Sequence, residues 1–153
     1  MTSRADHLTL PLVAALALVP LTSFAQDSLR LGIDVPREVR LGQPVPVTFR
    51  VENVAGRPLD LYLRGRTIAF DVIVERRGGG APVWRRLAGE IIPAILQLRT
   101  LAPGETFELR AEWDQRTNRG RRVSAGVYSV RGALLTDGAP LETAAVELRI
   151  LTP

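Results

Sequence analysis

The chain of 153 residues contains no cysteine and no lysine, and its only histidine is His7. Without cysteine no disulfide can form, and a zinc site built from the usual cysteine and histidine ligands is excluded. Without a later histidine there is no imidazole base for a serine nucleophile, and without lysine neither a Schiff base nor a P-loop can be built. We therefore predict a protein that is not an enzyme and that holds no cofactor and no metal.

Carboxylate pairs are the catalytic possibility that remains, because aspartate and glutamate alone can act as acid and base. The pairs that can be proposed are Asp71 with Glu75 and Glu112 with Asp114. Most of these positions alternate outward along predicted strands opposite arginines, which is typical of a solvated face or a surface ion pair. No aspartate-rich calcium loop occurs either, and Asp137-Gly138 is typical of a hairpin turn.

The amino-terminal residues 1–25 have the composition of an export signal. Arg4 precedes an apolar run over residues 8–21, and Ser23-Phe24-Ala25 offers small residues at the two positions that signal peptidase reads. A membrane anchor is the alternative, but Pro11 and Pro20 interrupt the run below the roughly 20 continuous apolar residues of a spanning helix. We expect cleavage before Gln26 and an exported protein, periplasmic or extracellular.

The charge of the chain is +4, and every basic residue apart from His7 is an arginine. The arginines are scattered and interleaved with acidic residues, which does not favour nucleic acid as a partner. The sequence contains no internal repeat, no low-complexity tract and no sign of a second domain. Residues 26–153 are therefore expected to form a single domain with its own core.

Apolar and polar residues alternate in short segments separated by glycine, proline and asparagine turns. The segments are 29–35, 45–52, 59–63, 67–75, 83–87, 107–113, 125–134 and 144–151. Short strands at this spacing predict an all-β fold, an immunoglobulin-like antiparallel β-sandwich of about seven or eight strands. Residues 90–101 are apolar without clean alternation, and they are compatible with a helical turn, an irregular edge strand or a covering loop.

Aromatic residues mark the predicted centre of the sandwich. Tyr128 follows the Ala125-Gly126 turn, where a tyrosine of an immunoglobulin-type sandwich sends its hydroxyl back to nearby backbone. Trp113 continues the inward face of its strand and is expected in the core. Trp84 is compatible either with the core or with an exposed binding surface.

Three segments are candidates for binding a partner protein. Two are rich in arginine, which indicates either solvated loop charge or a basic rim for an acidic surface or a protease. The third is apolar. The candidate residues are Arg76, Arg77, Arg85 and Arg86 at a hairpin with a triple-glycine tip, Arg119, Arg121 and Arg122 in the 116–122 loop, and Ile91, Ile92 and Ile95.

An ordered set of motifs resembles the BsuPI domain family. The motifs are F-D-V-I-V (70–74), V-W-R (83–85), A-I-L-Q-L-R-T-L-A-P-G-E (94–105), W-D (113–114) and G-R-R-V-S-A-G-V-Y-S-V-R-G-A-L (120–134). The resemblance extends over residues 45–135. The resemblance implies an immunoglobulin-like sandwich and a relation to an intracellular proteinase inhibitor, although this chain is expected to be exported.

Two hypotheses about function follow. The first is a proteinase inhibitor, or an inhibitor-like protein-binding module, that fills the cleft of a secreted protease and so excludes substrate. The second is a non-inhibitory structural or assembly module of the bacterial cell envelope, in which Ile91, Ile92 and Ile95 form an exposed patch for a fixed partner. Burial of these isoleucines between the sheets would remove the support for the second hypothesis. The oligomeric state is left open.

Overall fold

A computed structural model describes residues 28–153, so the predicted signal peptide, residues 1–25, lies outside the described residues. The described part consists of strands and loops without a helix. The strands are β1 (Leu29–Asp34), β2 (Glu38–Arg40), β3 (Val45–Asn53), β4 (Leu59–Arg64), β5 (Phe70–Arg76), β6 (Trp84–Arg85), β7 (Leu96–Leu101), β8 (Thr106–Trp113), β9 (Gly126–Leu134), β10 (Leu141–Glu142) and β11 (Val146–Leu151).

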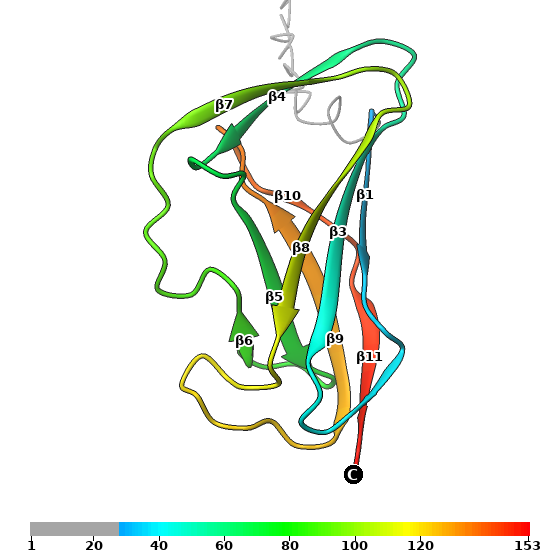
Figure 1. The fold of residues 1–153 in the computed structure, drawn as a ribbon, viewed down its shortest axis with the longest axis vertical. Coiled ribbons are helices and arrows are strands. Elements are labelled where there is room, and N and C mark those ends of the chain that lie inside the picture. Colours follow the sequence, from blue (N-terminus) through cyan, green and yellow to red (C-terminus); the bar gives the residue numbers. More distant parts are fainter. Residues whose placement is uncertain (1–27) are drawn as a thin grey trace, which may run out of the picture.

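Two sheets face each other, and a ribbon of two strands lies across one end of them (Figure 1). The first sheet has the order β1-β3-β8, and the second has the order β2-β11-β9-β5-β6, with β10 paired to β9. All pairs are antiparallel except β2 with β11. The predicted all-β sandwich is therefore confirmed.

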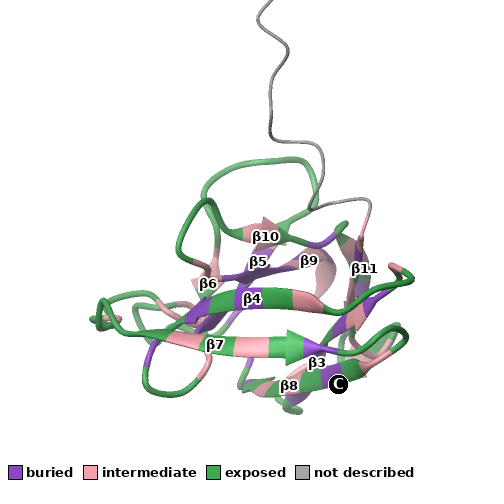
Figure 2. Ribbon diagram, turned by 90° about the horizontal axis from the view of Figure 1, so that it is seen from above, coloured by how far each residue is buried: buried purple, intermediate pink, exposed green. Residues whose placement is uncertain are grey.

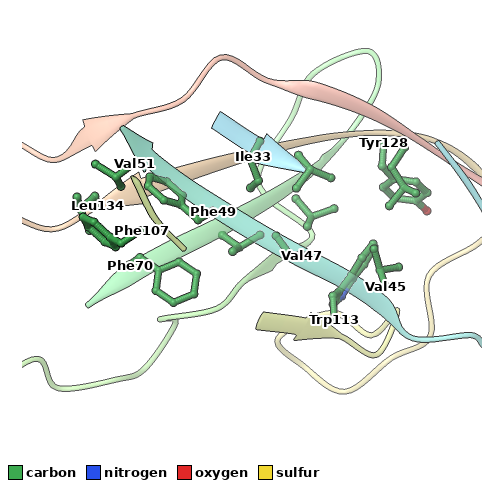
Figure 3. Close-up of a cluster of buried hydrophobic side chains, with 14 of the residues drawn as sticks. Ile33, Val45, Val47, Phe49, Val51, Phe70, Phe107, Trp113, Tyr128 and Leu134 are labelled. Atoms are coloured by element: carbon green, nitrogen blue, oxygen red, sulfur yellow. The ribbon is translucent and has the colours of Figure 1, made fainter. Parts of the chain in front are cut away.

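The core lies between the two sheets because the alternating apolar residues of each sheet point toward the other. Phe49 of β3 and Phe70 of β5 lie 6.0 Å apart between ring centroids. Trp113 of β8 meets Tyr128 of β9 edge to face at 5.9 Å. Figure 3 shows these side chains converging from both sheets. Trp113 is completely buried, as its position on the strand predicts.

The Tyr128 corner is present as predicted. The Tyr128 hydroxyl donates a hydrogen bond of 2.6 Å to the carbonyl oxygen of Ser124. The ring itself is buried, so the bond ties the turn before β9 to the middle of the core.

Gly132 of β9 packs directly against the Phe49 ring of the opposite sheet. A methyl group at this position would collide with the Phe49 ring and would come within 3.3 Å of Ile33 Cδ1. We expect Gly132→Ala to lower the free energy of unfolding by about 1–3 kcal/mol, because an overpacked core must shift to make room. Urea denaturation measures this change. Gly56→Ala is the control, since no atom lies within 4 Å of its added methyl group, and equal stability of the two variants would contradict the prediction.

Two short strands escaped the sequence prediction, β2 with three residues and β10 with two. β7 lies within residues 90–101, for which the sequence left an edge strand open as one of three structures. Residues 67–69, expected as the start of a strand, belong to a turn before β5. Such short strands lack the length over which alternation becomes visible.

The β4–β7 ribbon is attached to both sheets. The side-chain amide of Asn53, at the end of β3, donates to the carbonyl oxygens of Leu101 and Ala102 at 3.0 and 3.1 Å. On the other side, the Arg64 N–H donates to Leu135 O at 3.0 Å. These bonds hold the ribbon as a fixed platform at the end of the sandwich.

Candidate functional site

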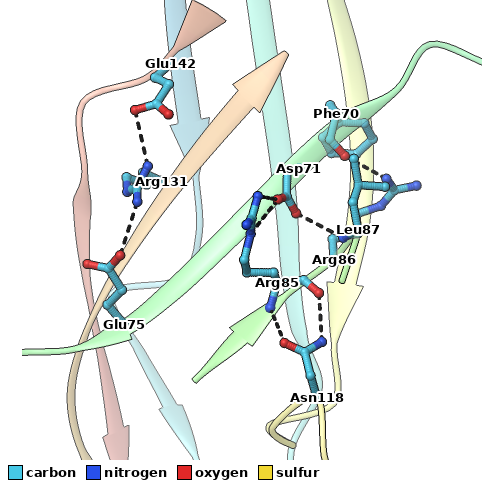
Figure 4. Close-up of polar contacts among 9 residues, drawn as sticks. All are labelled: Phe70, Asp71, Glu75, Arg85, Arg86, Leu87, Asn118, Arg131 and Glu142. Carbon is cyan, nitrogen blue, oxygen red and sulfur yellow. Dashed lines mark hydrogen bonds and ion pairs between the residues drawn. The ribbon is translucent and has the colours of Figure 1, made fainter. Parts of the chain in front are cut away.

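A buried carboxylate organises the edge of the second sheet. Asp71 of β5 is 1% exposed, and its Oδ2 accepts hydrogen bonds from Arg85 Nε at 2.9 Å and Arg85 Nη2 at 2.6 Å. Its Oδ1 accepts the Leu87 N–H at 3.0 Å (Figure 4). The expectation that Asp71 lies on a solvated face is therefore wrong. Both faces of β5 are buried from Phe70 to Val74, and on the outer face Arg85 and the Leu87 N–H cover Asp71.

Glu75 follows the expected pattern more closely. It is half-buried and pairs with Arg131 at 3.1 Å, and Arg131 also reaches Glu142 at 3.2 Å. Arg131 lies between the two carboxylates, as Figure 4 shows. This is an ion-pair network along β5, β9 and β10, and its partly exposed members indicate a structural role.

Asn118 joins the two arginine-rich segments. Its Oδ1 accepts the Arg85 N–H and its Nδ2 donates to Arg85 O, both at 2.8 Å. The 116–122 loop is therefore held against β6 as a further strand would be. The sequence analysis treated the hairpin and this loop as separate candidates, and Asn118 was missed because no local pattern distinguishes it from other loop asparagines.

Most of the candidate arginines are engaged within the protein. Arg76 donates to Ser124 Oγ at 2.7 Å, and Arg77 pairs with Glu147 at 2.9 Å. Arg86 donates to Phe70 O at 2.7 Å and its guanidinium carbon lies 4.3 Å from the centre of the Phe70 ring. These contacts and the Arg85–Asp71 pair stabilise the fold, and they leave these side chains less free to form a basic rim.

Arg119, Arg121 and Arg122 lie differently. Their side chains are exposed on the 116–122 loop and form no ion pair within residues 28–153. The structure thus divides the arginine candidates between a structural group at β5 and β6 and an exposed group on one loop.

Residues 87–95 form an exposed loop between β6 and β7, which we call the Ile91 loop. Ile91 is 93% exposed and Ile95 is 40% exposed. Ile92 is half-buried and lines a surface pocket of about 400 Å³ together with Ile68 and Arg86. The apolar patch therefore remains on the surface, and of the three structures left open by the sequence this segment is a loop that leads into an edge strand.

Both ends of the Ile91 loop are anchored. At the start, the Leu87 N–H is bound by Asp71 and the Arg86 N–H donates to Val72 O at 3.0 Å. At the end, Ile95 O accepts the Gly65 N–H at 2.9 Å, and Gln97 Nε2 donates to the carbonyl oxygens of Gly65 and Arg66. Only the middle of the loop is free of such contacts, so the loop projects from fixed points.

An apolar strip continues from the loop along the outer face of the β4–β7 ribbon. Tyr62 and Leu98 are register partners and are 46% and 58% exposed. Leu96 is exposed on the same face, two register pairs nearer to the Ile91 loop. In the view from above, both strands contain exposed residues (Figure 2). Leu96 directly follows Ile95, so exposed apolar side chains extend from the loop onto the ribbon, and such side chains mark protein contacts when they gather on a surface.

The ionisable groups with shifted pKa values lie away from this surface. On the outer face of the first sheet, hydrogen bonds from Arg50 and then Arg110 lower the pKa of Glu108. The same Glu108 bond, with the charge of Asp34, raises the pKa of Arg50. Across residues 28–153 there is neither a cluster of three potential metal-ligating side chains nor a helix that could span a membrane.

Comparison with known families decides the identity of the fold. Residues 35–138 match the model of BsuPI, described as an intracellular proteinase inhibitor. The chain belongs to the BsuPI family. The resemblance predicted over residues 45–135 is confirmed, and the family's description is that of an inhibitor whose partner is a proteinase.

The intracellular description of the BsuPI family overturns the expectation of an exported, periplasmic or extracellular protein. That expectation rested on residues 1–25 alone. An apolar run there has the composition of a signal peptide, but composition does not show that the segment is recognised and cleaved as one. Two details of the functional hypotheses depended on export and are withdrawn with it. They are the secreted location of the protease partner and the cell envelope as the location of an assembly module.

Solved structures resemble the chain only distantly. A β-glucosidase from Listeria innocua is 14% identical with a TM-score of 0.45, over 82% of this chain and 16% of the other. An alkylpurine DNA glycosylase from Pseudomonas fluorescens is 20% identical with a TM-score of 0.44, over 80% and 30%. A CARDB domain from Pyrococcus furiosus is 14% identical with a TM-score of 0.42, over 81% and 94%. No match was found among curated proteins.

Proposed function

We propose that this BsuPI-family chain is a proteinase inhibitor that acts by occlusion, with the Ile91 loop placed in the cleft of the proteinase. The observation that carries the proposal is an exposed apolar loop whose two ends are anchored to a rigid sandwich. A loop already held in one arrangement loses little conformational entropy on binding, so more of the contact energy is retained as affinity.

The surroundings of the loop support the same function. The apolar strip formed by Tyr62, Leu96 and Leu98 adjoins the loop and can cover the rim of the cleft. Burial of apolar surface is the main source of affinity between proteins, and a few central side chains supply most of it. The family's description as a proteinase inhibitor points to the class of partner.

The test measures inhibition constants of the full chain against purified proteinases of the serine, cysteine and metal-dependent classes. We expect at least one enzyme to be inhibited, and we expect replacement of residues 90–94 by a glycine–serine segment to abolish this inhibition. The matched control replaces residues 78–82, the exposed tip of the hairpin before β6, by a glycine–serine segment of the same length. If no enzyme slows at about 10 μM protein, and the Ile91 loop is simply cut, the proposal is wrong.

A non-inhibitory protein-binding module is the second candidate. The exposed Tyr62–Leu98 pair favours this candidate. The pair lies on the face of a two-stranded ribbon, and a partner protein without a proteinase cleft can cover such a face. Leu98→Glu separates the two candidates. It should reduce inhibition only modestly if the Ile91 loop dominates binding, whereas it should abolish association with a partner that covers the strip.

A further inference from the structure

We infer that Ile91 is the side chain that enters the primary specificity pocket of the target proteinase, and that this pocket is apolar and takes a branched aliphatic side chain. The inference rests on the proposed inhibitory function and specifies its partner. It concerns one side chain within the loop, so it can be wrong while the inhibition itself is real.

The exposure of Ile91 is the first reason. Its side chain is 93% exposed, whereas the other exposed large hydrophobic residues of the described chain range from 37% to 58%. Full burial of such an aliphatic side chain contributes about 1.5–3 kcal/mol. Ile91 therefore has the most to gain from entering a pocket, and within residues 28–153 its side chain is almost uncovered.

The direction of its neighbour is the second reason. Ile92 faces the protein, where it lines the pocket with Thr67, Ile68 and Arg86. Adjacent residues of an extended segment point to opposite sides. Ile92 thus anchors the middle of the loop inward while Ile91 points away from the sandwich.

Pro93 is the third reason. Its ring restricts φ to about −65°, and it holds the preceding Ile92 in an extended conformation. The loop is therefore stiffened next to the projecting side chain as well as at its ends. A proteinase cleft binds extended backbone, which is the conformation that the residue before a proline favours.

The chemistry of isoleucine selects the pocket. A pocket with a carboxylate at its base would be left with an unpaired buried charge, which is strongly unfavourable. A deep slot for a flat aromatic ring would be left partly empty, and each missing methylene costs about 1–3 kcal/mol. An apolar pocket of moderate depth satisfies the branched side chain best.

The experiment measures inhibition constants of the full chain and its variants against three serine proteinases, whose primary pockets accept aliphatic, aromatic and cationic side chains respectively. We expect the wild-type chain to inhibit the first enzyme about 100-fold more strongly than the other two. Ile91→Arg should move this preference to the cation-accepting enzyme, and Ile91→Phe should move it to the aromatic-accepting enzyme. Since Ile91 is exposed, both variants should unfold at the wild-type temperature.

Val54→Arg is the matched control, because it adds the same charge at an exposed hydrophobic position outside the loop. It should leave all three inhibition constants unchanged. If the wild-type chain inhibits but Ile91→Arg and Ile91→Phe change no constant by more than about threefold, Ile91 is not the pocket residue and the inhibitory function stands. A wild-type preference for either other enzyme also overturns the inference. Inhibition of none of the three, by any variant, overturns the inference, whereas the proposed function fails only if no enzyme of the serine, cysteine and metal-dependent classes is inhibited.

Discussion

Arg85→Met is expected to raise the inhibition constant about 10- to 100-fold, because it releases the anchored start of the Ile91 loop. Without the guanidinium group, the buried Asp71 carboxylate has no cation and must turn toward water, taking its bond to Leu87 with it. The carboxylate of this pair is buried and the Arg85 side chain is 52% exposed, so the loss of Arg85 should also lower the free energy of unfolding by about 1–3 kcal/mol. Inhibition assays and urea denaturation measure the two effects.

A double variant separates loop anchoring from general stability. Asp71→Leu combined with Arg85→Met leaves no unpaired charge, so much of the stability should return. The Leu87 N–H still lacks its acceptor, so inhibition should remain weak. Arg110→Met is the control, since Arg110 pairs with Glu108 on the exposed face of the first sheet and should change stability by less than about 0.5 kcal/mol. Wild-type inhibition by the double variant would show that the Asp71 anchor does not shape the loop.

Trp113→Ala is expected to lower the free energy of unfolding by about 3–5 kcal/mol, since the side chain is fully buried and leaves a large cavity. Trp113 stacks on Trp84 at 6.0 Å and meets Tyr128 edge to face at 5.9 Å. Its Nε1–H also donates to Arg116 O at 2.8 Å, which ties the core to the start of the 116–122 loop. Chemical denaturation followed by circular dichroism measures the loss.

Two further variants divide this effect into packing and hydrogen bonding. Trp113→Phe keeps most of the ring but removes the N–H donor to Arg116 O, and it should cost about 1–2 kcal/mol. Trp84→Ala removes a half-buried ring and should cost less than Trp113→Ala. If Trp113→Ala costs under about 1 kcal/mol, the packing between the sheets does not depend on this residue.

The two tryptophans also show how far sequence reasoning reached. Trp113 lies at the end of a long alternating strand, so its inward direction follows from the pattern. Trp84 lies in a strand of two residues, which is too short for alternation to show which side chains point inward. The sequence therefore did not decide whether Trp84 lies in the core or on the surface. In the structure Trp84 is half-buried and stacks on Trp113, within the arginine-rich hairpin of β5 and β6.

The candidate site was predictable only in part. The apolar composition of residues 90–98 singled out the Ile91 loop, and its isoleucines are on the surface as the protein-binding hypotheses require. The anchors were not predictable, because Asp71, Gly65 and Gln97 are separated from their loop partners by up to some thirty residues. Burial of Asp71 was mispredicted because alternation describes one covered face, and β5 is covered on both.

The sequence by itself determined the all-β class, the long strands, the Tyr128 corner and the membership in the BsuPI family, since each depends on residues close together along the chain. Only the tertiary structure decided which strands are neighbours, such as the parallel pairing of β2 with β11. It also decided that Gln115, at φ 59°, turns its buried amide to the 40–43 turn. Such contacts join segments that are distant in sequence. A local sequence pattern predicts a strand or a turn, but it does not indicate which distant segment that strand or turn will contact.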